Sequence, residues 1–133
     1  MRARLAGFVM CGAIIAPGGG ALAHHSSAMF DLQHKIEIQG TVREYKFVSP
    51  HTFIVLEVKG DDGSATVWTL EGNPPAGLSR DGWSRDTLAP GDKLKLKIGP
   101  LRSGAPGGWY TTEDTQYQDG TPIIKGGPQA EVR

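Results

Sequence analysis

Short runs of this 133-residue chain have the apolar pattern of β-strands, and no long stretch has the 3.6-residue period of a helix. The clearest case is the run KLKLKI, Lys93 to Ile98. A period of two places the aliphatic side chains on one face of a strand and the lysines on the other. The lysine row either protects an exposed sheet edge or offers positive charge to an anion. The pattern predicts an all-β protein.

Four further runs have the character of strands. They span residues 35–48, 51–59, 64–70 and 109–117. The first run changes the parity of its apolar positions along its length, so we expect a bulge or sharp bend near Gly40 to Glu44. The second is apolar without a break from Phe53 to Leu56, which indicates a central strand covered on both faces.

Turn signals and one short helix complete the layout. The sequence GDDG, Gly60 to Gly63, predicts a hairpin turn. The β pattern breaks after Leu70, where Asn73 is expected to cap a short helix with Leu78 as its inward anchor. Five strands with a helix between the third and fourth predict a small barrel of the oligonucleotide/oligosaccharide-binding type (OB-fold). An open β-sandwich is the alternative, because strand spacing alone does not separate the two.

The N-terminal sequence is typical of a secretory signal peptide. Arg2 and Arg4 precede the apolar run LAGFVMCGAIIA, and Ala21-Leu22-Ala23 forms a cleavage site. The apolar run is shorter than the ~20 residues of a membrane-spanning helix, so we expect a periplasmic or secreted protein without a stable membrane anchor. The predicted organisation is a signal peptide at 1–23, a histidine-containing leader at 24–34, the barrel at 35–125 and a flexible tail at 126–133.

The composition left after this cleavage excludes several classes of function. The single cysteine, Cys11, would be lost with the signal peptide, which excludes disulfides, thiolate zinc sites and cysteine nucleophiles. Two arginines would be lost as well, leaving 12 basic against 14 acidic residues. Because phosphate neutralisation dominates nucleic-acid binding, this balance argues against a nucleic-acid partner.

Adjacent histidines follow the predicted cleavage site and suggest a metal centre. Cleavage after Ala23 would give His24 a free α-amine, whose pKa near ~7.7–8.0 allows a metal ion to displace its proton. The amine and the imidazole of His24 would then chelate one ion, and imidazole nitrogen suits copper. His25 offers a competing mode, His51 at a strand start would complete the site, and His34 is a weaker candidate. The alternative is a polar leader and a histidine that only stabilises a turn.

Aromatic residues offer a second kind of site. Trp83, Trp109 and Tyr110 are candidate ligand-binding residues at the barrel face and its rim. The alternative is that these rings cover the core, because aromatic side chains bury well. The sequence contains neither a G-x-S-x-G nucleophile elbow nor a phosphate-binding glycine loop, so we predict no enzymatic activity.

Several segments together resemble a known family. These are HHSSAMFD, GTVREYKFVSPHTFIVLEV, VWTLEGNPP, LSRDGWSRDTLAPGDKLKLKIGPLRSG and DGTPI. In order and spacing they resemble the bacterial exported domain-of-unknown-function family DUF6152. The resemblance implies an exported β-barrel-like domain and no established activity. The N-P-H turn of that family appears here as Ser49-Pro50-His51, which retains the Pro-His pair.

Together these features predict a binding module of the cell envelope. Its partner would be an envelope protein or a small ligand. The alternative is copper or another transition metal at His24, His25 and His51, with or without an enzymatic reaction at that metal.

Overall fold

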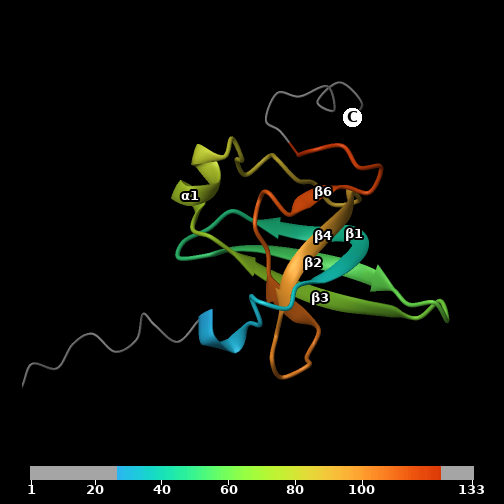
Figure 1. The fold of residues 1–133 in the computed structure, drawn as a ribbon. Helices are drawn as coiled ribbons and strands as arrows, with labels where there is room; N and C mark the ends of the chain where they lie inside the picture. Colours follow the sequence, from blue (N-terminus) through green and yellow to red (C-terminus); the bar gives the residue numbers. More distant parts are fainter. Residues whose placement is uncertain (1–26, 124–133) are drawn as a thin grey trace, which may run out of the picture.

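A computed structural model describes residues 27–123, which form a closed β-barrel with one short helix (Figure 1). The elements in chain order are a 3₁₀ turn η1 (Ser27–Met29), β1 (Ile36–Lys46), β2 (Thr52–Lys59), β3 (Ala65–Gly72), α1 (Pro75–Arg80), β4 (Lys93–Pro100), β5 (Gly107–Trp109) and β6 (Thr115–Tyr117). The ring runs β1-β2-β3-β5-β4 and closes by pairing of β1 with β4, while β6 adds to β4. The predicted small all-β barrel is confirmed, and this closure excludes the open sandwich.

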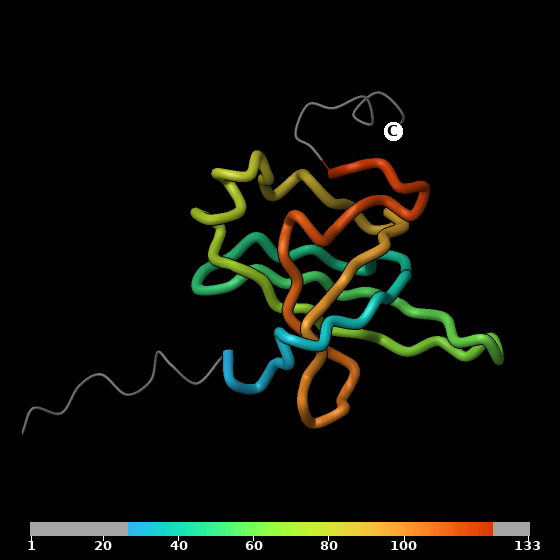
Figure 2. The backbone as a smooth tube through the Cα atoms, in the orientation of Figure 1, coloured from blue at the N-terminus to red at the C-terminus, as the bar shows by residue number. Residues whose placement is uncertain are grey.

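β1 is strongly bent and belongs to both halves of the barrel (Figure 2). Its first half pairs with β4 and its second half with β2, and the change occurs at Thr41. The register with β2 shifts between Val42 and Glu44, so the predicted bulge is confirmed. Gly40 allows the close approach at this crossing, since a Cβ atom there would lie 2.4 Å from the carbonyl oxygen of Glu57.

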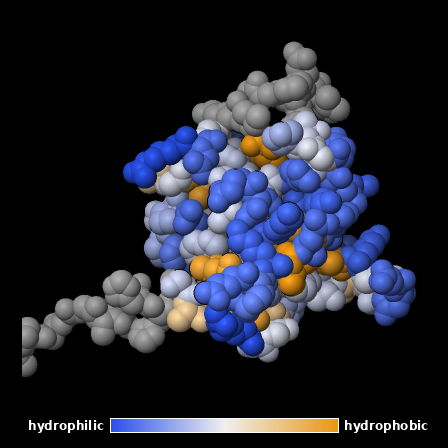
Figure 3. All heavy atoms as spheres, in the orientation of Figure 1, coloured by the Kyte–Doolittle hydropathy of each residue, from blue (hydrophilic) through white to orange (hydrophobic). Residues whose placement is uncertain are grey.

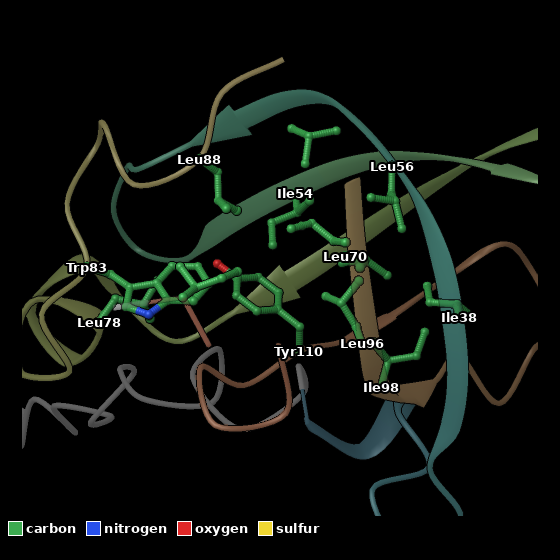
Figure 4. Close-up of a cluster of buried hydrophobic side chains, with 13 residues drawn as sticks. Ile38, Ile54, Leu56, Leu70, Leu78, Trp83, Leu88, Leu96, Ile98 and Tyr110 are labelled. Carbon is green, nitrogen blue, oxygen red and sulfur yellow. The ribbon is translucent and has the colours of Figure 1, made fainter. Parts of the chain in front are cut away.

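The core fills the barrel with aliphatic side chains from alternate strand positions (Figure 4). In β4 the predicted alternation holds, because Leu94, Leu96 and Ile98 are fully buried. Leu78 and Trp83 cover one end of this core. Burying a side chain of this size contributes about 1.5–3 kcal/mol relative to leaving it exposed.

The lysine row of β4 does not protect a sheet edge, and that alternative is wrong. β4 pairs with β1 on one side and with β5 and β6 on the other. Lys93, Lys95 and Lys97 therefore lie on the outer surface of a strand inside the ring. Hydrophilic side chains predominate on the face shown in Figure 3, and hydrophobic ones form small separate patches.

β2 is central, as predicted, but only one of its faces is fully covered. Ile54 and Leu56 are buried, whereas Phe53 and Val55 are half-buried on the outer face. The unbroken apolar run therefore does not mean burial on both sides. It gives the outer face of the β2–β3 hairpin an apolar strip.

The short helix between β3 and β4 is confirmed, with a different N-terminus. Pro74 occupies the N-cap position and no side chain caps the helix, so the predicted capping by Asn73 is wrong. Leu78 is buried as expected. Gly82 has φ 88° just after the helix, a conformation that glycine adopts without strain.

The predicted strand over residues 109–117 is divided in two. β5 ends at Trp109, the chain then turns through Thr111–Asp114, and β6 begins at Thr115. The hydroxyl of Thr115 donates to the carbonyl oxygen of Thr111, which stabilises the turn. The threonine-rich composition suits strand and turn equally, so the pattern did not distinguish them.

Parts of the predicted organisation lie outside the described residues. These are the signal peptide, His24, His25 and the tail at 126–133. No helix within residues 27–123 is long and apolar enough to span a membrane.

Candidate functional site

A histidine–glutamate pair lies where β2 begins and β3 ends. His51 directly precedes β2, and the register of the hairpin places Glu71 opposite Phe53. The Nδ1 atom of His51 contacts a carboxylate oxygen of Glu71, and the two side chains are 25% and 19% exposed. A carboxylate at Nδ1 favours the tautomer with its proton there, so Nε2 remains the acceptor nitrogen.

Trp109, the last residue of β5, packs against the His51 ring. It pairs with Glu71 across the parallel β3–β5 ladder. Its ring lies 5.7 Å from the His51 ring between centroids, at an interplanar angle of 83°. Because Trp109 is only half-buried, this contact lies at the surface of the barrel.

The segment before β1 also packs against Trp109. The ring of Phe30 lies 5.6 Å from that of Trp109, and Phe30 is 3% exposed. The backbone N–H of Asp31 donates to the carbonyl oxygen of Pro100 (2.8 Å), and the N–H of Arg102 donates to that of Met29 (2.9 Å). Residues 27–31 are therefore fixed on the side of the barrel that carries His51.

The other two predicted aromatic residues lie in the core. Trp83 and Tyr110 are both buried, with ring centroids 6.4 Å apart (Figure 4). The Thr52 hydroxyl donates to the carbonyl oxygen of Asn73 (2.9 Å), so the hydroxyl of Tyr110 donates to Thr52 (2.6 Å). Burial raises the pKa of Tyr110. Trp109 is thus the predicted aromatic residue that keeps exposed surface.

His34 forms a second histidine–carboxylate pair, which is open to solvent. Its Nδ1 lies 3.0 Å from Oδ2 of Asp31, and its side chain is 81% exposed. The hydrogen bond from His34 lowers the pKa of Asp31, and the backbone N–H groups of His34 and Gln33 act in the same direction. Within residues 27–123 no group of three or more His, Cys, Asp or Glu side chains is arranged to hold a metal ion.

The sequence analysis did not identify Glu71 as a site residue, because an acidic residue at a strand end is usually solvated. The register of the predicted hairpin could have identified it. Counting outward from the Gly60–Gly63 turn pairs Thr52 with Gly72, which brings Glu71 to the end of the ladder beside His51. Phe30 was also missed, because the few apolar residues of the short leader follow no strand or helix period.

Comparison with known proteins bears on the family of this chain. Residues 13–110, more than half of the chain, match the model of a family described as a family of unknown function (DUF6152). No curated protein and no solved structure is significantly similar. The match includes β1 to β5 and both members of the His51–Glu71 pair. This chain belongs to the DUF6152 family.

Proposed function

We propose that the protein is an exported binding module that holds a transition-metal ion, copper foremost, at His51 together with His24 and His25. The observation that carries this proposal is the contact between Nδ1 of His51 and the Glu71 carboxylate. Histidine ligands of metal ions usually donate their second ring nitrogen to a carboxylate or a carbonyl. Such a partner fixes the tautomer and the orientation of the ring.

The position of the N-terminal segment supports the participation of the leader. Phe30 and His51 both contact the ring of Trp109. His24 precedes Ser27 by three residues, and an extended chain spans about 10 Å over that length. We infer that this part of the leader brings the amine and imidazole of His24 towards Nε2 of His51.

The chemistry of these donors favours copper among the common metals. Two or three imidazoles and one amine form a nitrogen-rich set, and Cu²⁺ has the highest affinity for such sites among divalent first-row metals. Binding would be pH-dependent, because the imidazoles and the amine must be deprotonated. We infer a role in binding rather than in catalysis.

The first experiment determines the N-terminal residue of the mature protein. Mass spectrometry of the exported protein is expected to show a chain that begins at His24. Calorimetric Cu²⁺ titration of that mature protein, with electron paramagnetic resonance to detect nitrogen ligands, then measures the site. His51→Ala is expected to weaken Cu²⁺ binding strongly. Glu71→Gln is expected to weaken it by about 10–100-fold, the usual effect of removing an outer-shell partner.

His34→Ala is the matched control, since His34 is also paired with a carboxylate but is highly exposed. It is expected to leave Cu²⁺ affinity unchanged. Equal affinity in the wild type, His51→Ala and His34→Ala would contradict the proposal, and so would a mature chain that begins after His25.

A second candidate function uses the same surface for an organic ligand. OB-type barrels bind ligands on the face of their second and third strands, and here that face carries half-buried Phe53 and Val55. Trp109 follows on β5, separated from Phe53 by Glu71. A ligand that binds metal-free protein and loses affinity in Trp109→Ala, but not in His51→Ala, would favour this function.

A further inference from the structure

A groove lies where β1 changes its pairing partner, between the end of β2 and the start of β4. Its volume is about 310 Å³, and it is lined by Gln39, Gly40, Thr41, Glu57, Lys59, Lys93 and Gln118. Thr41 pairs with Glu57 on one side and with Lys93 on the other. Because paired residues share a face of a sheet, these three side chains form a row across the groove.

The charges in the groove are unbalanced towards positive. Within the described part of the chain, neither Lys59 nor Lys93 has a carboxylate partner within ion-pair distance. The acid in the groove, Glu57, is paired with Arg43, whose Nε lies 3.4 Å from Oε2. An anion entering the groove would therefore meet two ammonium groups and one neutralised carboxylate.

Lys95, the neighbour of Lys93 on the same face of β4, differs from Lys93 because it has a carboxylate partner. Its Nζ lies 3.1 Å from a carboxylate oxygen of Glu37. The lysine row is thus neutralised at Lys95 and left unpaired at Lys93, at the end that borders the groove. Lys97 also has no carboxylate within ion-pair distance among the described residues, but it lies at the other end of the row, away from the groove.

Neutral hydrogen-bonding groups complete the lining. Nε2 of Gln118 donates to Oε1 of Gln39 (3.1 Å), so the two amides form one bridge along the groove. This bond leaves the amide N–H groups of Gln39 and the amide oxygen of Gln118 for a ligand. The Thr41 hydroxyl, on the row between Glu57 and Lys93, is a further donor and acceptor.

We propose that this groove binds a polyhydroxylated carboxylate, the chemistry of a uronic-acid sugar. The ammonium groups of Lys59 and Lys93 would hold the carboxylate as point charges. The amides and the Thr41 hydroxyl would bond the sugar hydroxyls. The volume lies within the usual range of small-molecule sites, about 300–1,000 Å³. The site is independent of His51 and of any metal.

The test is an NMR titration of the ¹⁵N-labelled protein with D-glucuronate. Parallel titrations with D-glucose and with acetate are the controls. Glucuronate is expected to shift the backbone amides of Gln39, Thr41, Lys59, Lys93 and Gln118. Glucose lacks the carboxylate and acetate lacks the hydroxyls, so each is expected to bind much more weakly. Lys59→Ala and Lys93→Ala are each expected to weaken glucuronate binding about tenfold, the size of one hydrogen bond to a charged group.

Lys95→Ala is the control, since it removes a lysine of the same strand and face whose charge is already paired. It is expected to leave glucuronate affinity unchanged. The proposal is overturned if glucuronate shifts none of these amides, if glucose or acetate shifts them equally, or if the three lysine variants behave alike. All three substitutions are at the surface, so the spectra also verify that each variant is folded.

Discussion

At the level of single residues, carboxylate partners determine what the basic side chains on this barrel can do. Glu71 contacts Nδ1 of His51 and leaves Nε2 as the acceptor nitrogen, whereas Asp31 contacts His34 in a solvent-exposed turn. Lys95 is neutralised by Glu37, while Lys93 on the same strand is not. The same residue type therefore carries different chemistry according to its neighbours across the sheet.

Asp114 shows the effect of such a pair on stability. Its carboxylate accepts a hydrogen bond from Lys35, which joins the segment before β1 to the loop between β5 and β6. This bond is the main reason that the pKa of Asp114 lies below its ordinary value of 3.8. Since the pKa is lower in the folded state, the stabilisation is complete above the unfolded value and is lost as pH falls through the folded pKa.

We predict that Asp114→Asn lowers the free energy of unfolding at neutral pH by about 0.2–1 kcal/mol, the usual range for a partly exposed pair. The wild type should lose this advantage as the pH falls below the unfolded pKa. Urea unfolding of both proteins across this pH range measures the difference. Equal free energies of unfolding of the two proteins at every pH would show that the pair contributes nothing.

At the level of elements, the period-two pattern was sufficient to predict most strands but insufficient to predict which strands pair with one another. Alternation identified the buried residues of β4, and the change of parity predicted a bulge near Gly40 to Glu44, where the register shifts between Val42 and Glu44. Whether β4 is an edge strand depends on which strands pair with it. The sequence of a strand does not show its pairing with strands that are distant in the chain. The same reason explains why Trp109 was recognised as a candidate while its contact with His51 was not.

Gly40 is the residue that permits β1 to cross from β4 to β2. A Cβ atom there would lie 2.4 Å from the Glu57 carbonyl oxygen and 2.8 Å from Cγ of Leu56. We predict that Gly40→Ala lowers the free energy of unfolding by about 1–3 kcal/mol, because the strands must separate to admit the methyl group. Chemical denaturation measures this loss.

Gly77→Ala in α1 is the matched control. Its Cβ would make an ordinary contact, 3.5 Å from Cβ of Asn73. Alanine favours a helix over glycine, so this substitution is expected to stabilise the protein by about 0.5–1 kcal/mol. Equal effects of the two substitutions would show that the crossing at Gly40 is not tightly packed.

At the level of the whole molecule, the strand ladders that close the barrel differ in length. The β2–β3 ladder contains eight residue pairs, whereas β5 contributes three pairs to β3 and two to β4. Gly108 permits the close approach of β5 to β4, since a Cβ atom there would lie 2.7 Å from the carbonyl oxygen of Gly99. The short β5 is therefore the weakest part of the ring.

We predict that the ring opens first along β5. The N–H of Thr69 donates across this junction to Pro106 (3.3 Å) and that of Tyr110 to Glu71 (2.8 Å). Local opening has a free energy below that of global unfolding, so these amides should exchange with solvent faster than those in the middle of the β2–β3 ladder. Hydrogen exchange followed by NMR measures both. Equal protection of the two groups would show that the barrel opens only as a unit.

The anchoring of Phe30 has a practical consequence for anyone who shortens the polypeptide. A fragment that starts at the first residue of β1, Ile36, would lose the Phe30 ring that packs on Trp109. It would also lose the backbone hydrogen bonds that Met29 and Asp31 make with Arg102 and Pro100, at and just beyond the end of β4. Expression fragments intended for crystallisation or for spectroscopy should therefore retain the chain from Ser27 onward.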